Sequence, residues 1–221
     1  MRKNSIREKM FNHIPISTPI LETAHYDNKH FYSIDGEKFP SITTILHSFE
    51  NKGIEVWKRK TPNWKDIQEE SFKVGTELHS MIEAYLKNKE YNKNITDMGT
   101  TLFYNLIPEL LKINNIQAQE TRLYHKDLKV AGQVDCIAEY DGEKCVIDFK
   151  NSRKPKKEQW ISDYKIQVTA YSKMWEYCTN QKIDLGVILI ANWDGTTSTF
   201  KVDIPKYEDN LLDVLEAYAN L

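Results

Sequence analysis

The sequence predicts an α/β fold in which helices flank a mixed β-sheet, with a mostly helical segment before the sheet. Apolar residues recur at helical spacing up to about residue 113, and after Asn115 the hydrophobic period changes toward two. A further helical segment then separates the predicted strands. Such a mixture of strands and helices is typical of a sheet that is covered by helices.

The N-terminal half contains one predicted hairpin and two long helices. The turn signal Asp35-Gly36 lies between two short extended runs, at 30–34 and 37–39, and predicts a β-hairpin. Apolar side chains then repeat at helical spacing in two segments, 69–89 and 101–113. These elements are expected to precede the main sheet.

The C-terminal half contains the predicted sheet. Strands are expected at 118–127, 130–140, 143–150, 185–192 and 197–202. Helices are expected at 163–178 and 207–221. Because no linker interrupts the chain, we expect an N-terminal arm and hairpin at 1–38, followed by a single domain at 39–221. Within this domain we expect a helical part at 41–115 and a catalytic core at 116–221.

Composition places the chain among ordinary globular proteins. Hydrophobic residues make up 40% and charged residues 28% of the chain, and the net charge of −2 gives no general attraction to nucleic acid, so any such site must be local. No apolar run approaches the roughly 20 residues of a membrane helix. Three cysteines without C-x-x-C spacing argue against an iron–sulfur cluster. We expect a cytoplasmic monomer with no membrane partner.

The most informative stretch is AGQVDCIAEYDGEKCVIDFKNS, residues 131–152. If Asp141-Gly142 is the centre of a symmetric hairpin, Asp135 opposes Asp148 across neighbouring strands. Two carboxylates among apolar residues need positive charge between them. Lys150 lies on the same face as Asp148, and a divalent cation would remove the remaining repulsion. The alternative is a solvated surface hairpin, but the runs VDCIA and CVIDF favour burial.

Three motifs now resemble a known group of enzymes. The pattern G-x-V-D…I-D-x-K resembles the PD-(D/E)XK nuclease superfamily, and its RecB-like branch in particular, through Gly132, Val134, Asp135, Ile147, Asp148 and Lys150. The Q-x-x-x-Y and G-x-x-x-H motifs of that branch are similar to Gln167…Tyr171 and Gly75…His79. Within the branch, residues 39–205 are similar to the mitochondrial genome maintenance exonuclease family and its phage and bacterial relatives. The resemblance implies a restriction-endonuclease-like fold.

The resemblance also implies the residues of the site. The expected catalytic residues are Asp135, Asp148, Lys150, Gln167 and Tyr171, with Gln167 orienting Lys150. One or two Mg²⁺ or Mn²⁺ ions are expected on His79, Glu120, Asp135, Asp148 and the Phe149 carbonyl. Glu120 has the alternative of an exposed strand-edge side chain, and Glu77 and Glu139 are weaker candidates. His79 alone would more often be a core or surface histidine.

Contacts with DNA are expected from local basic, hydroxyl and aromatic side chains. The loop after the predicted catalytic strand offers phosphate contacts through Ser152, Arg153, Lys154 and Lys156. Ser41 and Thr43 offer hydroxyl hydrogen bonds, although capping of a short helix explains Ser41 equally well. Trp57 lies among lysines, a combination suited to stacking single-stranded bases, with ordinary packing as the alternative.

The function implied by the resemblance is a metal-dependent DNA exonuclease in replication, recombination or repair. Single-stranded DNA with free ends is the expected substrate, and a single-strand annealing or replication protein is a candidate partner. A bacterial or phage-infected cell is the expected setting, ahead of a mitochondrion. Two alternatives stay open: a structure- or sequence-specific endonuclease on the same core, and a catalytically silent DNA-binding scaffold. The intact Asp135, Asp148 and Lys150 argue against the scaffold.

Overall fold

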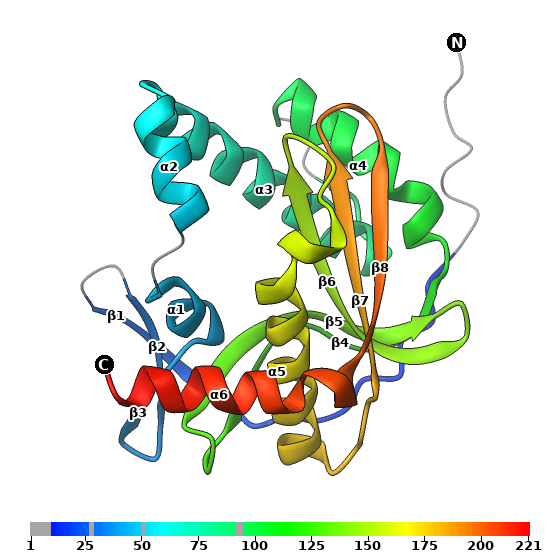
Figure 1. The fold of residues 1–221 in the computed structure, drawn as a ribbon. Helices are drawn as coiled ribbons and strands as arrows, with labels where there is room; N and C mark the ends of the chain where they lie inside the picture. Colours follow the sequence, from blue (N-terminus) through cyan, green and yellow to red (C-terminus); the bar gives the residue numbers. More distant parts are fainter. Residues whose placement is uncertain (1–9, 27–28, 50–51, 92–94) are drawn as a thin grey trace.

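A five-stranded mixed sheet, in the order β4-β5-β6-β7-β8, forms the centre of the computed structural model (Figure 1). Its strands are Ile113–His125, Val130–Tyr140, Glu143–Ser152, Leu185–Asn192 and Thr197–Asp203. β6 and β7 pair in parallel, and the other neighbours are antiparallel. The structure describes residues 10–26, 29–49, 52–91 and 95–221, so the first nine residues of the expected arm lie outside it. The predicted mixed sheet is confirmed.

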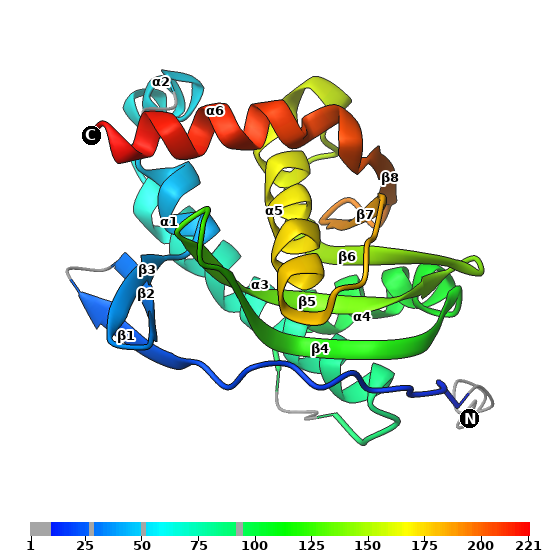
Figure 2. The same cartoon turned by 90° about the horizontal axis from the view of Figure 1, so that it is seen from below.

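Helices cover both faces of this sheet (Figure 2). One face packs against α3 (Trp64–Leu86) and α4 (Asp97–Leu110), and the other against α5 (Ser162–Thr179). On β6 the neighbours Val146 and Ile147 belong to opposite cores, because successive side chains of a strand point to opposite faces. This double burial explains the almost continuous apolar runs in the sequence.

The β5–β6 hairpin has the predicted register. Tyr140 opposes Glu143, and Cys136 opposes Ile147. The turn residues have positive φ, 52° at Asp141 and 82° at Gly142, as a tight two-residue turn requires. Regular pairing extends from the turn to Cys136 and does not include the adjacent Asp135, where the site begins.

The N-terminal part forms a second, smaller sheet of β1 (Glu22–Tyr26), β2 (Lys29–Ile34) and β3 (Glu37–Pro40). The β2–β3 hairpin confirms the turn predicted at Asp35-Gly36, and β1 was not predicted. Tyr32, Ile34 and Phe39 pack with Leu21 and with Ala131 of β5. Two short helices follow, α1 (Ile42–His47) and α2 (Lys52–Lys60).

The segment before β1 runs along the outer edge of β4 (Figure 2). Ile14 and Ile16 donate backbone hydrogen bonds to the carbonyls of Ile116 (2.9 Å) and Gln117 (3.1 Å). The amide of Ile116 donates in return to the Asn12 carbonyl at 2.9 Å. The segment therefore satisfies backbone groups near the start of this strand edge.

α4 runs from Asp97 to Leu110 rather than over 101–113, because Thr96 caps its start and β4 begins at 113. Two further boundaries also differ from the prediction for physical reasons. α3 begins at Trp64 rather than near Glu69, because its first turns are largely exposed and carry no apolar stripe. β4 begins at Ile113 rather than at Ala118, because a bulge between Asn114 and Ala118 disturbs the alternation of apolar residues. The chain ends in α6 (Glu208–Ala219), close to the helix expected there. No described helix is long and apolar enough to cross a membrane.

Candidate metal and active site

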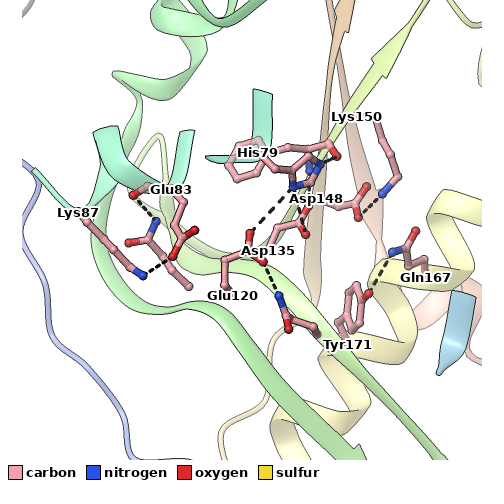
Figure 3. A network of polar contacts seen from close by, with 12 residues as sticks. His79, Glu83, Lys87, Glu120, Asp135, Asp148, Lys150, Gln167 and Tyr171 are labelled. Carbon is pink, nitrogen blue, oxygen red and sulfur yellow. Dashed lines mark hydrogen bonds and ion pairs between the residues drawn. The ribbon is translucent and has the colours of Figure 1, made fainter. Parts of the chain in front are cut away.

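Three potential metal ligands from three different elements meet beside the sheet (Figure 3). His79 on α3, Glu120 on β4 and Asp135 on β5 each offer one ligand atom, and these atoms lie within 4.8 Å of one another. His79 Nδ1 lies 3.8 Å from Asp135 Oδ1 and 4.0 Å from Glu120 Oε1. The structure thus brings together three residues of which the first, His79, and the last, Asp135, are 56 positions apart in the sequence. One imidazole nitrogen with two carboxylates is a donor set that can hold a divalent cation.

The orientation of His79 is fixed from its other ring nitrogen. Nε2 lies 3.0 Å from the Phe149 carbonyl, and donation to that oxygen leaves Nδ1 facing the carboxylates. A metal-binding histidine commonly donates its second ring N–H to a backbone carbonyl in this way. The Phe149 carbonyl therefore has a hydrogen-bond partner in the structure, and its role as a metal ligand stays a prediction.

The carboxylates control the charge of His79. Burial by itself lowers the pKa of the imidazole, but the negative charges of Asp135 and Glu120 outweigh that effect and raise the pKa to about 9. Without a metal ion the ring is therefore protonated at neutral pH. Its positive charge then offsets part of the negative charge of the two carboxylates.

The backbone of Glu120 departs from ordinary strand geometry. Its φ is 46°, and the β4–β5 pairing passes from Gln119 opposite Cys136 to Thr121 opposite Val134. A left-handed conformation at a non-glycine residue costs roughly 1 to 3 kcal/mol. Gln133 Nε2 donates to Glu120 Oε2 at 2.6 Å and fixes the side chain. An exposed strand-edge glutamate would need neither feature, so the geometry favours a functional Glu120.

Two contacts join Asp135 and Asp148 to the chain around them. Asp135 Oδ2 accepts a hydrogen bond from the Phe149 amide at 2.8 Å, where regular pairing of the two strands has ended. Asp148 is fully buried, and its Oδ1 accepts a hydrogen bond from Lys150 Nζ at 2.6 Å. Asp148 Oδ2 has no hydrogen-bond partner among the described residues. Because an unpaired buried carboxylate oxygen is costly, this atom fits a site that gains a cation ligand.

Burial and charge set the protonation of Asp148 and Lys150. Desolvation raises the pKa of Asp148, Lys150 lowers it and Asp135 raises it, with a result of about 6. For Lys150, desolvation lowers the pKa, but Asp148 and Asp135 more than compensate and raise it above its ordinary value. Lys150 is therefore an ammonium group in the metal-free site. It offers positive charge rather than a free base.

The Q-x-x-x-Y pair lies on one face of α5 as predicted, but its hydrogen bond differs from the expected role. Gln167 Nε2 donates to the Tyr171 hydroxyl at 3.0 Å, and no hydrogen bond joins Gln167 to Lys150 among the described residues. Tyr171 also explains the glycine of the G-x-V-D motif. A Cβ on Gly132 would lie 2.8 Å from Tyr171 Cε1. The pair thus packs beneath β5, next to the aspartates (Figure 3).

The basic loop after β6 is only partly open to a ligand. The guanidinium of Arg153 lies 4.1 Å from the Trp193 ring centroid and pairs with Glu70, so it holds the loop against α3. Ser152 Oγ donates to the Lys154 carbonyl at 2.7 Å. The side chain of Lys154 is exposed, and Lys156 is half-buried. Of these four candidates, the two lysines are the better placed to reach phosphate.

The hydroxyl and tryptophan candidates for DNA contacts differ in how accessible their side chains are. Ser41 is buried and caps α1, since its Oγ accepts the Thr44 amide at 3.0 Å. Thr43 Oγ1 lies 2.9 Å from the Ser41 hydroxyl. These contacts explain Ser41 by capping rather than by phosphate binding. Trp57 on α2 is 41% exposed and remains available for stacking.

Sequence reasoning missed two groups of side chains around the site. Tyr164 lies one helical turn before Gln167, and its ring centroid is 5.3 Å from Lys150 Nζ. The spacing of 164, 167 and 171 on one helix face would have indicated it. Asn151 Oδ1 accepts a hydrogen bond from Trp193 Nε1 at 3.2 Å, and a Cβ on Gly75 would lie 2.8 Å from Asn151 Nδ2. No local pattern indicates that contact between α3 and β6.

Comparison with known proteins agrees with the motifs. No protein-family model matches the sequence. Over 175 residues the chain is 30% identical to mitochondrial genome maintenance exonuclease 1 of Homo sapiens, a match that covers 71% of this chain and 50% of that protein. The Xenopus tropicalis and Mus musculus proteins of the same name are 28% and 29% identical over 171 residues each, covering 71% of this chain and 49% and 51% of theirs.

The chain spans about half the length of these relatives. Among solved structures, the crystal structure of SSO0001 has a TM-score of 0.34 and 18% identity, covering 47% of this chain and 49% of that one, a likeness too slight to support an argument. The sequence relatives confirm the resemblance inferred from the D…D-x-K, Q-x-x-x-Y and G-x-x-x-H motifs. The chain is a homologue of the mitochondrial genome maintenance exonucleases.

Proposed function

We propose that the protein is a metal-dependent DNA exonuclease that hydrolyses phosphodiester bonds. The observation that carries the proposal is the convergence of His79, Glu120 and Asp135 beside a buried Asp148–Lys150 pair. The relatives are named genome maintenance exonucleases, which supports the same class of reaction.

The proposed metal ligands are His79 Nδ1 with carboxylate oxygens of Glu120, Asp135 and Asp148. The unpartnered Asp148 Oδ2 and the orientation of the imidazole support this set. When bound there, Mg²⁺ or Mn²⁺ would lower the pKa of a water molecule and offset charge on the scissile phosphate. Gln133 and the Phe149 backbone would hold the ligands in place through their hydrogen bonds to Glu120, Asp135 and His79.

In the proposed reaction Lys150 supplies positive charge. Its ammonium group would stabilise the negative charge that develops on the phosphate oxygens. Asp148 accepts a hydrogen bond from Lys150 and limits where the ammonium can lie. Gln167 and Tyr171 would support the floor of the site through their mutual hydrogen bond and the contact of Tyr171 with Gly132.

The proposed substrate is single-stranded DNA with a free end. Exposed Lys154 and half-buried Lys156 would contact the backbone, and Trp57 would stack on a base. We also propose a single-strand annealing or replication protein as a partner, and the cytoplasm of a bacterial or phage-infected cell as the setting.

The test is digestion of end-labelled linear single-stranded, linear duplex and circular single-stranded DNA with Mg²⁺ or Mn²⁺. Asp135→Asn and Asp148→Asn remove ligand charge, and Glu139→Gln is the matched control, because Glu139 lies on β5 but accepts its hydrogen bond from Asn115. We expect loss of linear single strands only, abolished in both aspartate variants. Cleavage of circles would favour the endonuclease, and DNA binding without cleavage would favour the silent scaffold.

A further inference from the structure

Lys150 has two partners on opposite elements of the site. Its Nζ lies 2.6 Å from Asp148 Oδ1 on its own strand and 5.3 Å from the centroid of the Tyr164 ring on α5. The ring is half-buried and packs against the apolar core on that side of the sheet. Its position is therefore fixed by packing, whereas Lys150 reaches it on a flexible four-carbon chain.

The two partners differ in what they can do when the site is loaded. A cation on Asp148 would share the carboxylate charge and weaken its hold on Lys150. An aromatic face attracts an ammonium group but offers no ligand atom to Mg²⁺ or Mn²⁺. The attraction from Tyr164 would therefore persist when that from Asp148 is reduced.

A second lysine lies near the same ring. Lys156 Nζ is 6.0 Å from the Tyr164 centroid, at the limit of this kind of contact. The ring thus lies between the strand that carries Lys150 and the loop that carries a proposed phosphate contact. Gln167, the residue expected to orient Lys150, instead donates its amide hydrogen bond to Tyr171.

We propose that Tyr164 is a positioning residue whose ring holds the Lys150 ammonium group at the reacting phosphate. This inference rests on the proposed nuclease function. It assigns the role to the ring face rather than to the phenol hydroxyl. Tyr164→Phe should therefore retain the positioning of Lys150, because phenylalanine keeps the ring, and Tyr164→Leu should lose it.

The test compares Tyr164→Leu and Tyr164→Phe on linear single-stranded DNA at saturating Mn²⁺. Loss of a contact of this strength lowers kcat about 2- to 30-fold. We expect that loss in Tyr164→Leu with KM unchanged, and recovery in Tyr164→Phe. Lys156→Ala should show the reverse pattern, a raised KM with little change in kcat. Tyr177→Leu is the control, because Tyr177 lies at the far end of α5 and packs on Tyr124 and His125.

A second measurement needs no catalysis. In the metal-free protein, acetylation of Lys150 by an amine-reactive ester, followed by mass spectrometry, should be faster in Tyr164→Leu than in wild type or Tyr164→Phe. Mn²⁺ binding stoichiometry measured by calorimetry shows whether each variant is folded at the site. If wild type cuts no DNA, the proposed function fails, and the acetylation rates still test the contact.

Three results would overturn the inference. One is an unchanged kcat in Tyr164→Leu with an unchanged acetylation rate. Another is a loss in Tyr164→Phe equal to that in Tyr164→Leu, which would assign the effect to the hydroxyl. The third is a Mn²⁺ stoichiometry in Tyr164→Leu that falls in proportion to kcat, which would make the residue merely structural.

Discussion

Gly75→Ala should destabilise the protein when residue 151 is asparagine and stabilise it when residue 151 is alanine. A Cβ at Gly75 would lie 2.8 Å from Asn151 Nδ2, closer than van der Waals contact allows. Asn151 cannot move freely, since its side chain is joined to Trp193 Nε1 at 3.2 Å and to the Ser71 carbonyl at 3.4 Å. The substitution therefore forces α3 away from β6 or breaks these hydrogen bonds.

The magnitudes decide the expected sign. Overpacking of this kind costs about 1 to 3 kcal/mol, and replacing glycine by alanine inside a helix contributes about 1 kcal/mol in return. Gly75→Ala should therefore lower the free energy of unfolding by about 0 to 2 kcal/mol in the wild-type background. With Asn151→Ala the obstacle is gone, and the same change should raise it by about 1 kcal/mol.

Urea unfolding of the four proteins in this double-mutant cycle measures the coupling directly. His79 lies one helical turn beyond Gly75, so Mn²⁺ affinity measured by calorimetry should also fall in Gly75→Ala and recover in the double variant. Equal stability effects of Gly75→Ala in both backgrounds would refute the reasoning. So would an unchanged Mn²⁺ affinity in a destabilised single variant.

Three further predictions concern other parts of the molecule. Gly132→Ala should lower the free energy of unfolding by about 1 to 3 kcal/mol in urea, because its Cβ would lie 2.8 Å from Tyr171 Cε1; stability equal to wild type would contradict the contact. Burial lowers the pKa of His125 below 6.5, so the unfolded chain binds a proton before the folded one does. His125 therefore opposes folding as pH falls from 7 to 5, whereas Asp148, with its pKa raised to about 6, acts in the opposite sense over the same range. The expected result is thus a difference: as pH falls, wild type should lose stability relative to His125→Phe, and parallel profiles would exclude this cause. Lys154→Ala should reduce the slope of log K against log salt for single-stranded DNA by about 0.7, whereas Arg153→Ala, whose side chain has internal partners, should leave it unchanged, as fluorescence titrations can show.

β5 and β6, the strands that carry the two aspartates and Lys150, were predictable because they are buried on both faces. β5 and β7 have the predicted bounds, and the Asp141-Gly142 turn set the register of the β5–β6 hairpin. The grouping of His79 with Glu120 and Asp135 came from a family resemblance, since nothing local links a helix residue to two strands. The geometry of the cluster now supports that grouping independently.

The contacts that could not be predicted depend on side chains that are distant in sequence. Arg153 belongs to a basic run, but Glu70 and Trp193 hold its guanidinium in place. The hydrogen bond of Gln167 to Tyr171 was not predicted either, because spacing places a residue on a helix face without specifying which neighbour its amide contacts. Glu120 could be nominated from its strand, but its positive φ arises from the local break in β4–β5 pairing.

The segment along β4 covers part of one edge of the central sheet and so affects where a strand of another molecule could pair with it. Its hydrogen bonds to Ile116 and Gln117 occupy the start of the β4 edge, and among the described residues no strand pairs with the outer side of β8. An unpaired edge is a template for a strand of another molecule. Two molecules that joined antiparallel through β8 would pair this edge of both central sheets with each other, so the same edge would not be open to a third molecule.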